Sequence, residues 1–296
     1  MAIGAIGVSA SSIFIDLSGT TPGTASFFRC ALALPLLVVL ARIERRQEGA
    51  LSWRRWAVAV AAGVLFAGDA LLWTQAIFEV GAGLSTVLVN AQVFIVPLLA
   101  LLIDRERLRR AFLLMLPVMV VGILLTGGVF EAGSSGSNPT LGTIHAILAA
   151  LCYSGFLFLL RRGGATGHVV ESYGVVVAAA AAVSLGAGAL WQGVTLAPGW
   201  AAVGWLALTA ACGQVLGWLL VALATSHLPA DVGAALLMLT PVGSLVLAAL
   251  VLGQQPTWLQ LIGCALVLAS AYLASTSMTP ARRFARLKAN ASRSMK

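Results

Sequence analysis

Charged residues are scarce in this sequence. They make up 9% of the 296 residues, whereas 60% are hydrophobic. Soluble domains typically contain about 25% charged and about 45–50% apolar residues, so an ordinary water-soluble protein is excluded. Because one membrane crossing takes about 20 apolar residues, the chain can form ten crossings with short loops but no separate soluble domain.

The sequence also lacks the patterns of catalytic and metal-binding sites. It contains no nucleotide-binding loop, nucleophile elbow or pair of catalytic carboxylates. Its few cysteines lie far apart inside apolar runs and therefore predict neither disulfides nor a zinc site. We expect no enzyme, no metal, no cofactor and no ATP-driven pump. The cysteines are Cys30, Cys152, Cys212 and Cys264.

Apolar runs bounded by glycine, proline or charge predict ten membrane-spanning helices. The first run lacks the positive segment of a signal peptide, so we interpret it as the first span. The fold class expected is therefore an all-α integral membrane protein with ten transmembrane helices. The predicted spans are 2–17, 24–41, 56–78, 82–103, 111–130, 141–160, 170–191, 200–224, 231–252 and 258–276.

The positive charges give the predicted orientation. The net charge is +8, and on a soluble domain such a charge would indicate nucleic-acid binding. Here all but one of the 18 lysines and arginines lie in the loops after predicted spans two, four and six or in the C-terminal tail. Since such residues concentrate on the cytoplasmic side, we expect both termini in the cytoplasm of a bacterial inner-membrane protein and no nucleic-acid partner. The exception is Arg29.

An internal repeat suggests how the spans are related. Residues 82–106 resemble residues 230–254, an offset of 148 positions that contains five predicted spans. An odd number of spans inverts the second copy, a construction that recurs in secondary transporters. We predict two inverted five-span repeats followed by a basic cytoplasmic tail. The expected boundaries are 1–132, 133–278 and 279–296.

Four segments carry a family resemblance. They read ASFFRCALALPLLV (25–38), TQAIFEVGAGLSTVL (74–88), DRERL (104–108) and LTPVGSLVLAALVLGQQPTWLQLIGCALVLA (239–269). Over nearly its whole length the chain resembles the EamA-type, ten-helix transporters of the drug/metabolite transporter (DMT) superfamily. It departs from their pattern at Gln254, where glutamate is common. Its lightly charged, tryptophan-bearing interior is similar to that of the YddG-type aromatic amino-acid exporters, a resemblance that implies export of amino acids.

Polar and aromatic residues inside the spans are the candidates for substrate binding. An ionisable group in a membrane costs about 2.5–3.5 kcal/mol and is therefore a functional candidate. Asp69 and Trp73 lie one turn apart on one helix face, and the repeat places Trp218 on an equivalent surface. We expect an aromatic cavity in which Asp69 binds an ammonium group or a proton, although helix packing explains these residues equally well. The cavity candidates are Phe14, Asp69, Trp73, Asn90, Tyr153 and Trp218.

Three further residues are candidates for a gate or an ion pair. Asp16 and Arg29 approach the same membrane face, so they are predicted either to pair or to leave Arg29 for a substrate carboxylate. His145, near the outer end of its span, titrates in the range of the outside pH or serves as a structural residue. Gln214 lies within Gly213-x-x-x-Gly217, a spacing that favours close helix packing.

The function expected is secondary transport. The chain would export small metabolites, above all aromatic or other neutral amino acids, by alternating access. The alternatives left open are an integral-membrane enzyme that acts on a lipid-borne substrate and a DMT transporter of drugs or other metabolites. The expected partners are a small-molecule substrate and the lipid bilayer, and a monomer is compatible with the sequence.

Overall fold

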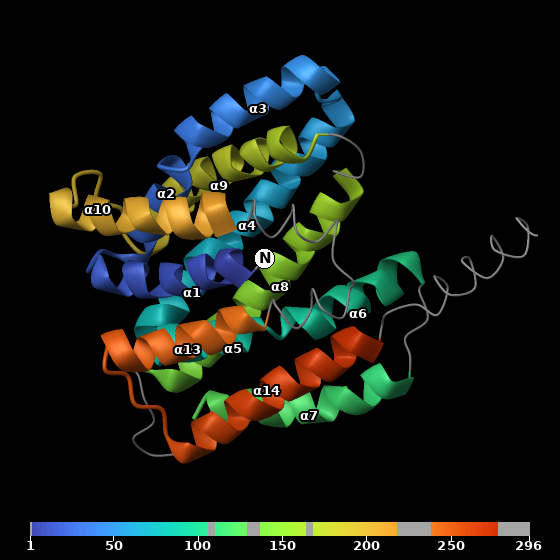
Figure 1. Cartoon of the computed structure of the whole chain (residues 1–296), viewed down its shortest axis with the longest axis vertical. Coiled ribbons are helices and arrows are strands. Elements are labelled where there is room, and N and C mark those ends of the chain that lie inside the picture. Colours follow the sequence, from blue (N-terminus) through green and yellow to red (C-terminus); the bar gives the residue numbers. More distant parts are fainter. Residues whose placement is uncertain (1, 106–109, 129–136, 164–167, 218–237, 278–296) are drawn as a thin grey trace, which may run out of the picture.

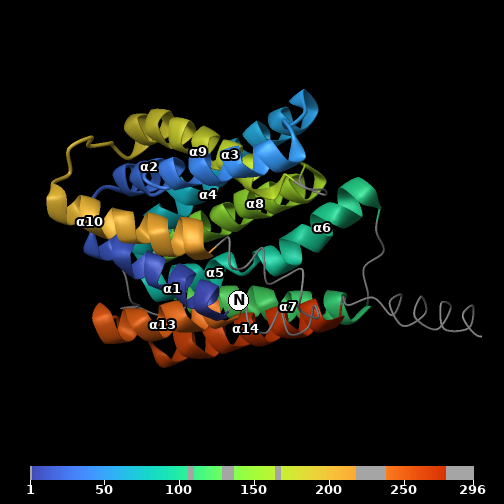
Figure 2. The ribbon, with the colours of Figure 1, turned by 45° about the horizontal axis from the view of Figure 1, so that its top comes forward.

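The described part of the protein is entirely helical. A computed structural model of the 296-residue chain describes residues 2–105, 110–128, 137–163, 168–217 and 238–277. Within these ranges there is no strand, and the helices form one bundle (Figure 1, Figure 2). The elements are α1 (Ala2–Leu17), α2 (Pro22–Ala31), α3 (Leu34–Glu48), α4 (Trp53–Val80), α5 (Ala82–Val89), α6 (Gln92–Asp104), α7 (Arg110–Thr126), α8 (Pro139–Gly163), α9 (Val169–Trp191), α10 (Trp200–Leu208), the π-helix η1 (Thr209–Gly217), α13 (Leu239–Val251) and α14 (Trp258–Ser277).

Seven helical segments are long and apolar enough to cross a membrane. Three shorter apolar helices, Ile3–Leu17, Phe112–Thr126 and Leu239–Val251, accompany them. The protein is therefore a multi-pass membrane protein. The seven long segments are Pro22–Glu48, Trp53–Val80, Ala82–Asp104, Pro139–Leu160, Val169–Trp191, Trp200–Gly217 and Trp258–Thr276.

Two of the predicted spans contain a short break in the regular α-helix, although each still forms one long helical segment. The span predicted at 24–41 forms α2 and α3, which meet just before Pro35, a residue that has no backbone N–H to donate. The span predicted at 82–103 forms α5 and α6, which meet at Asn90 and Ala91. Asn90 donates its side-chain amide to the carbonyl of Thr86, 2.9 Å away. At both places backbone hydrogen bonds between residues three apart, such as Ala33 N–H to Cys30 O and Ala91 N–H to Leu88 O, replace part of the regular helical pattern.

The helix pairs join the two halves of the chain. Helix α8 packs along α4, and α1 packs along η1, while α7 lies beside α14 in both views (Figure 1, Figure 2). Helix α5 packs against α13, and α2 packs against α9. Every one of these contacts pairs an element from the first half of the chain with one from the second half.

Close packing of α1 on η1 confirms the expected role of the two glycines around Gln214. A Cβ atom on Gly213 would lie 2.7 Å from the Ser11 Cβ atom, and one on Gly217 would lie 2.6 Å from the Val8 Cγ2 atom. Only residues without a side chain allow the helices to approach this closely.

Helices α1, α4 and α13 end at the same end of the bundle, where their last turns line a pocket. We call this end the pocket end. Exposed tryptophans mark both ends, because Trp53 and Trp56 begin α4 whereas Trp191 ends α9 and Trp200 begins α10. Tryptophan favours membrane–water interfaces, so this placement agrees with helices that cross a bilayer.

Candidate functional site

A cluster of polar and aromatic side chains lies inside the bundle, and we call it the central cluster. It consists of Arg29 on α2, Asp69 and Trp73 on α4, Tyr153 on α8 and Gln214 on η1. Four of these five residues were candidates from the sequence, and Gln214 was expected only to assist packing. The structure brings together residues that are up to 185 positions apart in the chain.

Arg29 is the only cation in this cluster. Its side chain is largely buried, with 7% of the residue exposed, and its Nη2 donates a 3.0 Å hydrogen bond to the Gln214 Oε1. The guanidinium carbon lies 5.1 Å from the centre of the Trp73 ring and 5.9 Å from that of Phe66. The faces of aromatic rings attract a cation at such distances, so two rings help to hold the charge.

Several donors in the cluster have no partner within the described residues. They are Nε and Nη1 of Arg29 and Nε2 of Gln214, all of them buried. A buried polar group without a hydrogen bond costs about 1–3 kcal/mol, and more when it is charged. The arrangement therefore favours an additional acceptor beside Arg29.

Asp69 supplies the opposite charge. Its residue is 6% exposed, and its carboxylate lies within electrostatic range of the Arg29 guanidinium. Among the described residues, however, the two form no direct salt bridge, and no hydrogen bond reaches the Asp69 side chain. Tyr153 lies within electrostatic range of both charges. The cluster thus holds a guanidinium group and a carboxyl group that influence each other electrostatically but are not in direct contact.

Gln214 is held in place by its backbone as well as by its side chain. The Tyr173 hydroxyl on α9 donates a 3.0 Å hydrogen bond to the Gln214 carbonyl. This carbonyl lies in the π-helix η1, in which hydrogen bonds join residues five apart instead of the four of an α-helix. π-Helical turns are rare and occur frequently at functional sites, which supports the choice of this region as the candidate site.

The family follows from a comparison of the whole sequence. The EamA-like transporter family matches residues 1–128 and 140–276. The chain belongs to the EamA-like transporter family. This family lies within the DMT superfamily, so the resemblance inferred from the four segments is confirmed at that level.

Solved structures agree with this assignment of the fold. One solved crystal structure of another protein is similar to this chain. The TM-score is 0.62, the sequence identity is 19%, and the match covers 96% of each chain. At this identity the likeness concerns the fold alone. No curated protein matches the sequence.

A second polar group in this EamA-like transporter lies near the pocket end, and we call it the Glu79 network. The Glu79 carboxylate binds His145 Nδ1 at 2.5 Å and accepts a 2.8 Å hydrogen bond from Gln75 Nε2. Gln192 donates to Gln75 Oε1 at 3.2 Å, and the Trp191 ring packs edge-on against His145. The gate candidate His145 is thus bound to a carboxylate that connects α4 to α8.

Reasoning from the sequence missed Glu79. The residue lies two positions before the glycine that ends α4, so it resembled an interfacial charge at a helix end. The structure buries it, with 7% exposed. The signal in the sequence was its spacing from Gln75, because residues four apart share one helix face.

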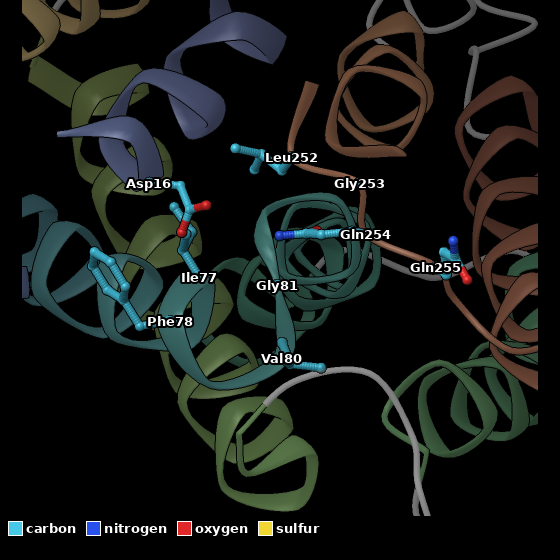
Figure 3. Close-up of a pocket in the computed structure, with 9 residues that line it drawn as sticks. All are labelled: Asp16, Ile77, Phe78, Val80, Gly81, Leu252, Gly253, Gln254 and Gln255. Carbon is cyan, nitrogen blue, oxygen red and sulfur yellow. The ribbon is translucent and has the colours of Figure 1, made fainter. Parts of the chain in front are cut away.

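The pocket at the pocket end has a volume of about 470 Å³. Asp16 from the end of α1 and Gln254 from the turn after α13 extend into it from opposite sides (Figure 3). The α4–α5 junction forms part of the wall at Gly81, where φ is 98°. A Cβ atom at this glycine would lie 2.8 Å from the Gln254 Oε1, so a side chain there would displace Gln254.

The remaining candidates take other places. The expected pair of Asp16 with Arg29 does not form, because Arg29 binds Gln214 deeper in the bundle while Asp16 lines the pocket. Phe14 stacks on Trp205 of α10 with ring centres 5.7 Å apart. Asn90 bonds within its own helix. Trp218 and the basic tail at 279–296 lie outside the described residues.

Proposed function

We propose that this EamA-like protein is a secondary transporter of small zwitterionic metabolites, above all aromatic or other neutral amino acids. The central cluster is the proposed binding site. Arg29 would bind the substrate carboxylate and Asp69 its ammonium group, while Trp73 and Tyr153 would contact an apolar side chain. Like the YddG-type exporters, it would move amino acids out of the cell.

The observation that carries this proposal is the unpaired state of two opposite charges. Arg29 keeps two buried donors without a partner among the described residues, although the Asp69 carboxylate is within electrostatic range. A zwitterion would supply both missing partners at once. A carboxylate binds a guanidinium through two parallel hydrogen bonds, which adds specificity as well as affinity.

We further propose ten transmembrane helices in two inverted repeats, 1–132 and 133–278, with both termini in the cytoplasm of a bacterial inner membrane. The pocket end then faces outward. Support comes from the family match in each half of the chain and from helix contacts that pair the two halves. Rocking of such halves around a site near the bilayer midplane exposes it to one side at a time.

Counterflow in proteoliposomes tests the proposal. Vesicles with purified full-length protein are loaded with unlabelled amino acid, and uptake of labelled amino acid is measured with and without a pH gradient. We expect saturable exchange of aromatic and other neutral amino acids. No amino-acid exchange by correctly inserted protein would refute the proposed substrate class, and exchange of drugs or other metabolites in its place would establish the alternative.

Two substitutions probe the recognition of the carboxylate. Arg29→Lys keeps the positive charge but cannot form two parallel hydrogen bonds to one carboxylate. The rate of exchange should therefore fall about tenfold or more. The matched control is Arg45→Lys on α3, whose side chain is exposed far from the cluster and whose ion pair with Glu171 is long, at 3.9 Å. Exchange at the wild-type rate in Arg29→Lys would contradict a specific role in carboxylate binding.

A further inference from the structure

We infer that the pocket lined by Asp16 is a second binding site, which takes the ammonium group of a primary amine at the outer face. The inference rests on the proposed function for its orientation and for the kind of molecule that passes. The pocket would be a separate site, and it would recognise fewer groups of the ligand than the central cluster does.

The size and lining of the pocket suit a small organic molecule. Its volume of about 470 Å³ is within the range of about 300–1,000 Å³ usual for ligand sites. The Asp16 carboxylate and the Gln254 amide extend towards each other across the pocket, and Ile77 and Leu252 lie beside them (Figure 3). Convergent polar groups in a cavity of this size are typical of sites that orient their ligand.

The charge of the pocket favours a cation. The Asp16 side chain is half-buried and has no hydrogen-bond or ion-pair partner among the described residues. The described residues of the pocket end contain no lysine or arginine, and the other carboxylate there, Glu79, is already bound to His145 and Gln75. Asp16 therefore gives this pocket a negative potential that no described neighbour cancels.

The position of the pocket connects it with the central cluster. Both are built on α4, since Asp69 and Trp73 belong to the cluster and Ile77 to Gly81 line the pocket. Eight residues separate Asp69 from Ile77, which corresponds to about 12 Å along the helix. An amine that leaves the central cluster towards this end meets Asp16 about two turns later. Among the described residues no lysine or arginine pairs with Asp16, so the pocket requires the amine but not the carboxylate.

Protection from a thiol reagent tests this site. A cysteine is introduced by Gln255→Cys at the exposed edge of the pocket, with Cys152 and Cys212 replaced by alanine. Labelling of full-length protein in proteoliposomes by a membrane-impermeant maleimide is followed with phenylalanine, phenylethylamine or phenylpropionate. We expect the first two to slow labelling and phenylpropionate, which has no amine, to have no effect.

Variants assign the protection to Asp16. Asp16→Asn should raise the phenylethylamine concentration needed for half protection by about tenfold, and Asp16→Glu should restore most of the protection. Asp69→Asn should leave protection by phenylethylamine unchanged. Unaltered protection in Asp16→Asn, loss of protection in Asp69→Asn, or equal protection by sodium or calcium ions alone would overturn the inference.

The binding assay is independent of transport. Asp16-dependent protection without amino-acid counterflow would support the outer site and refute the proposed function. Amino-acid counterflow without protection by any amine would support the function and refute the outer site.

Discussion

The central cluster and the Glu79 network both place ionisable side chains inside the helix bundle, but they differ in how these side chains are paired. Glu79 accepts hydrogen bonds from His145 and Gln75 on both of its carboxylate oxygens. Arg29 and Asp69 lie within electrostatic range of each other without a direct bond. Removing one partner of a buried charged pair is destabilising, whereas a buried donor without a partner gains free energy when a ligand supplies an acceptor. The difference separates a structural site from the proposed binding site.

The largest expected effect is that of Arg29→Met. Loss of the charged donors should reduce amino-acid counterflow about 100-fold, because charge-assisted hydrogen bonds to a carboxylate contribute about 1.5–3 kcal/mol. The melting temperature should change little, because the loss of the hydrogen bond to Gln214 is offset by the removal of two buried donors that have no partner among the described residues. Initial counterflow rates and thermal unfolding of the purified protein measure the two quantities. A parallel fall of both would place Arg29 with the structural residues.

Glu79→Leu should show the reverse pattern. It leaves the partly buried His145 without its acceptor and should lower the free energy of unfolding by about 3 kcal/mol. Counterflow per folded molecule should stay close to that of the wild type. Thermal unfolding and counterflow normalised to the folded fraction test this, with Glu79→Gln as the milder control. Abolished counterflow in a stable Glu79→Leu protein would mean that the network takes part in transport.

Tyr173→Phe should have an intermediate effect on both quantities. It removes the hydrogen bond to the Gln214 carbonyl and should cost about 1 kcal/mol of stability. Because Gln214 then positions Arg29 less firmly, the substrate concentration for half-maximal counterflow should rise while the maximal rate changes little. A kinetic series over substrate concentration distinguishes the two parameters, and a change in maximal rate alone would argue against this positioning role.

The smallest effect is expected for Gln192→Leu, at the partly exposed end of the Glu79 network. It removes bonds to Gln75 and to the Leu71 carbonyl, each 3.2 Å long, and should lower stability by about 0.5 kcal/mol. Counterflow should not change. A thermal shift as large as that of Glu79→Leu would show that the network depends on its outermost member.

Composition and periodicity were enough to predict the membrane class, because a run of apolar residues has few alternatives to a buried or lipid-facing helix. The family also followed from local motifs, and the Gly213–Gly217 spacing predicted close helix packing, for which the structure supplies α1 as the partner. Pro35 inside its span indicated a possible bend there, whereas the break at Asn90 was not predicted. Hydropathy averages over a whole span and does not show where a helix changes direction.

Four of the five residues of the central cluster were candidates from the sequence, but their contacts were not predicted. Asp69 and Trp73 share a helix face by spacing alone, whereas the partner of Arg29 lies 185 positions away on a π-helix. Asp16 was expected beside Arg29 because both approach one membrane face, yet depth along the bundle separates them. The burial of Glu79 depends on α8, which covers the end of α4, and no local pattern contains this contact.

By itself the sequence determined that the chain is a multi-pass membrane protein of a transporter family, since apolar length and family motifs are properties of the chain alone. The tertiary structure decided which charges are paired and which are not. Pairing depends on distances of a few ångströms between helices that are remote in sequence. The scarcity of charge indicated where function resides, but only helix packing distinguished Arg29 and Asp69 from Glu79.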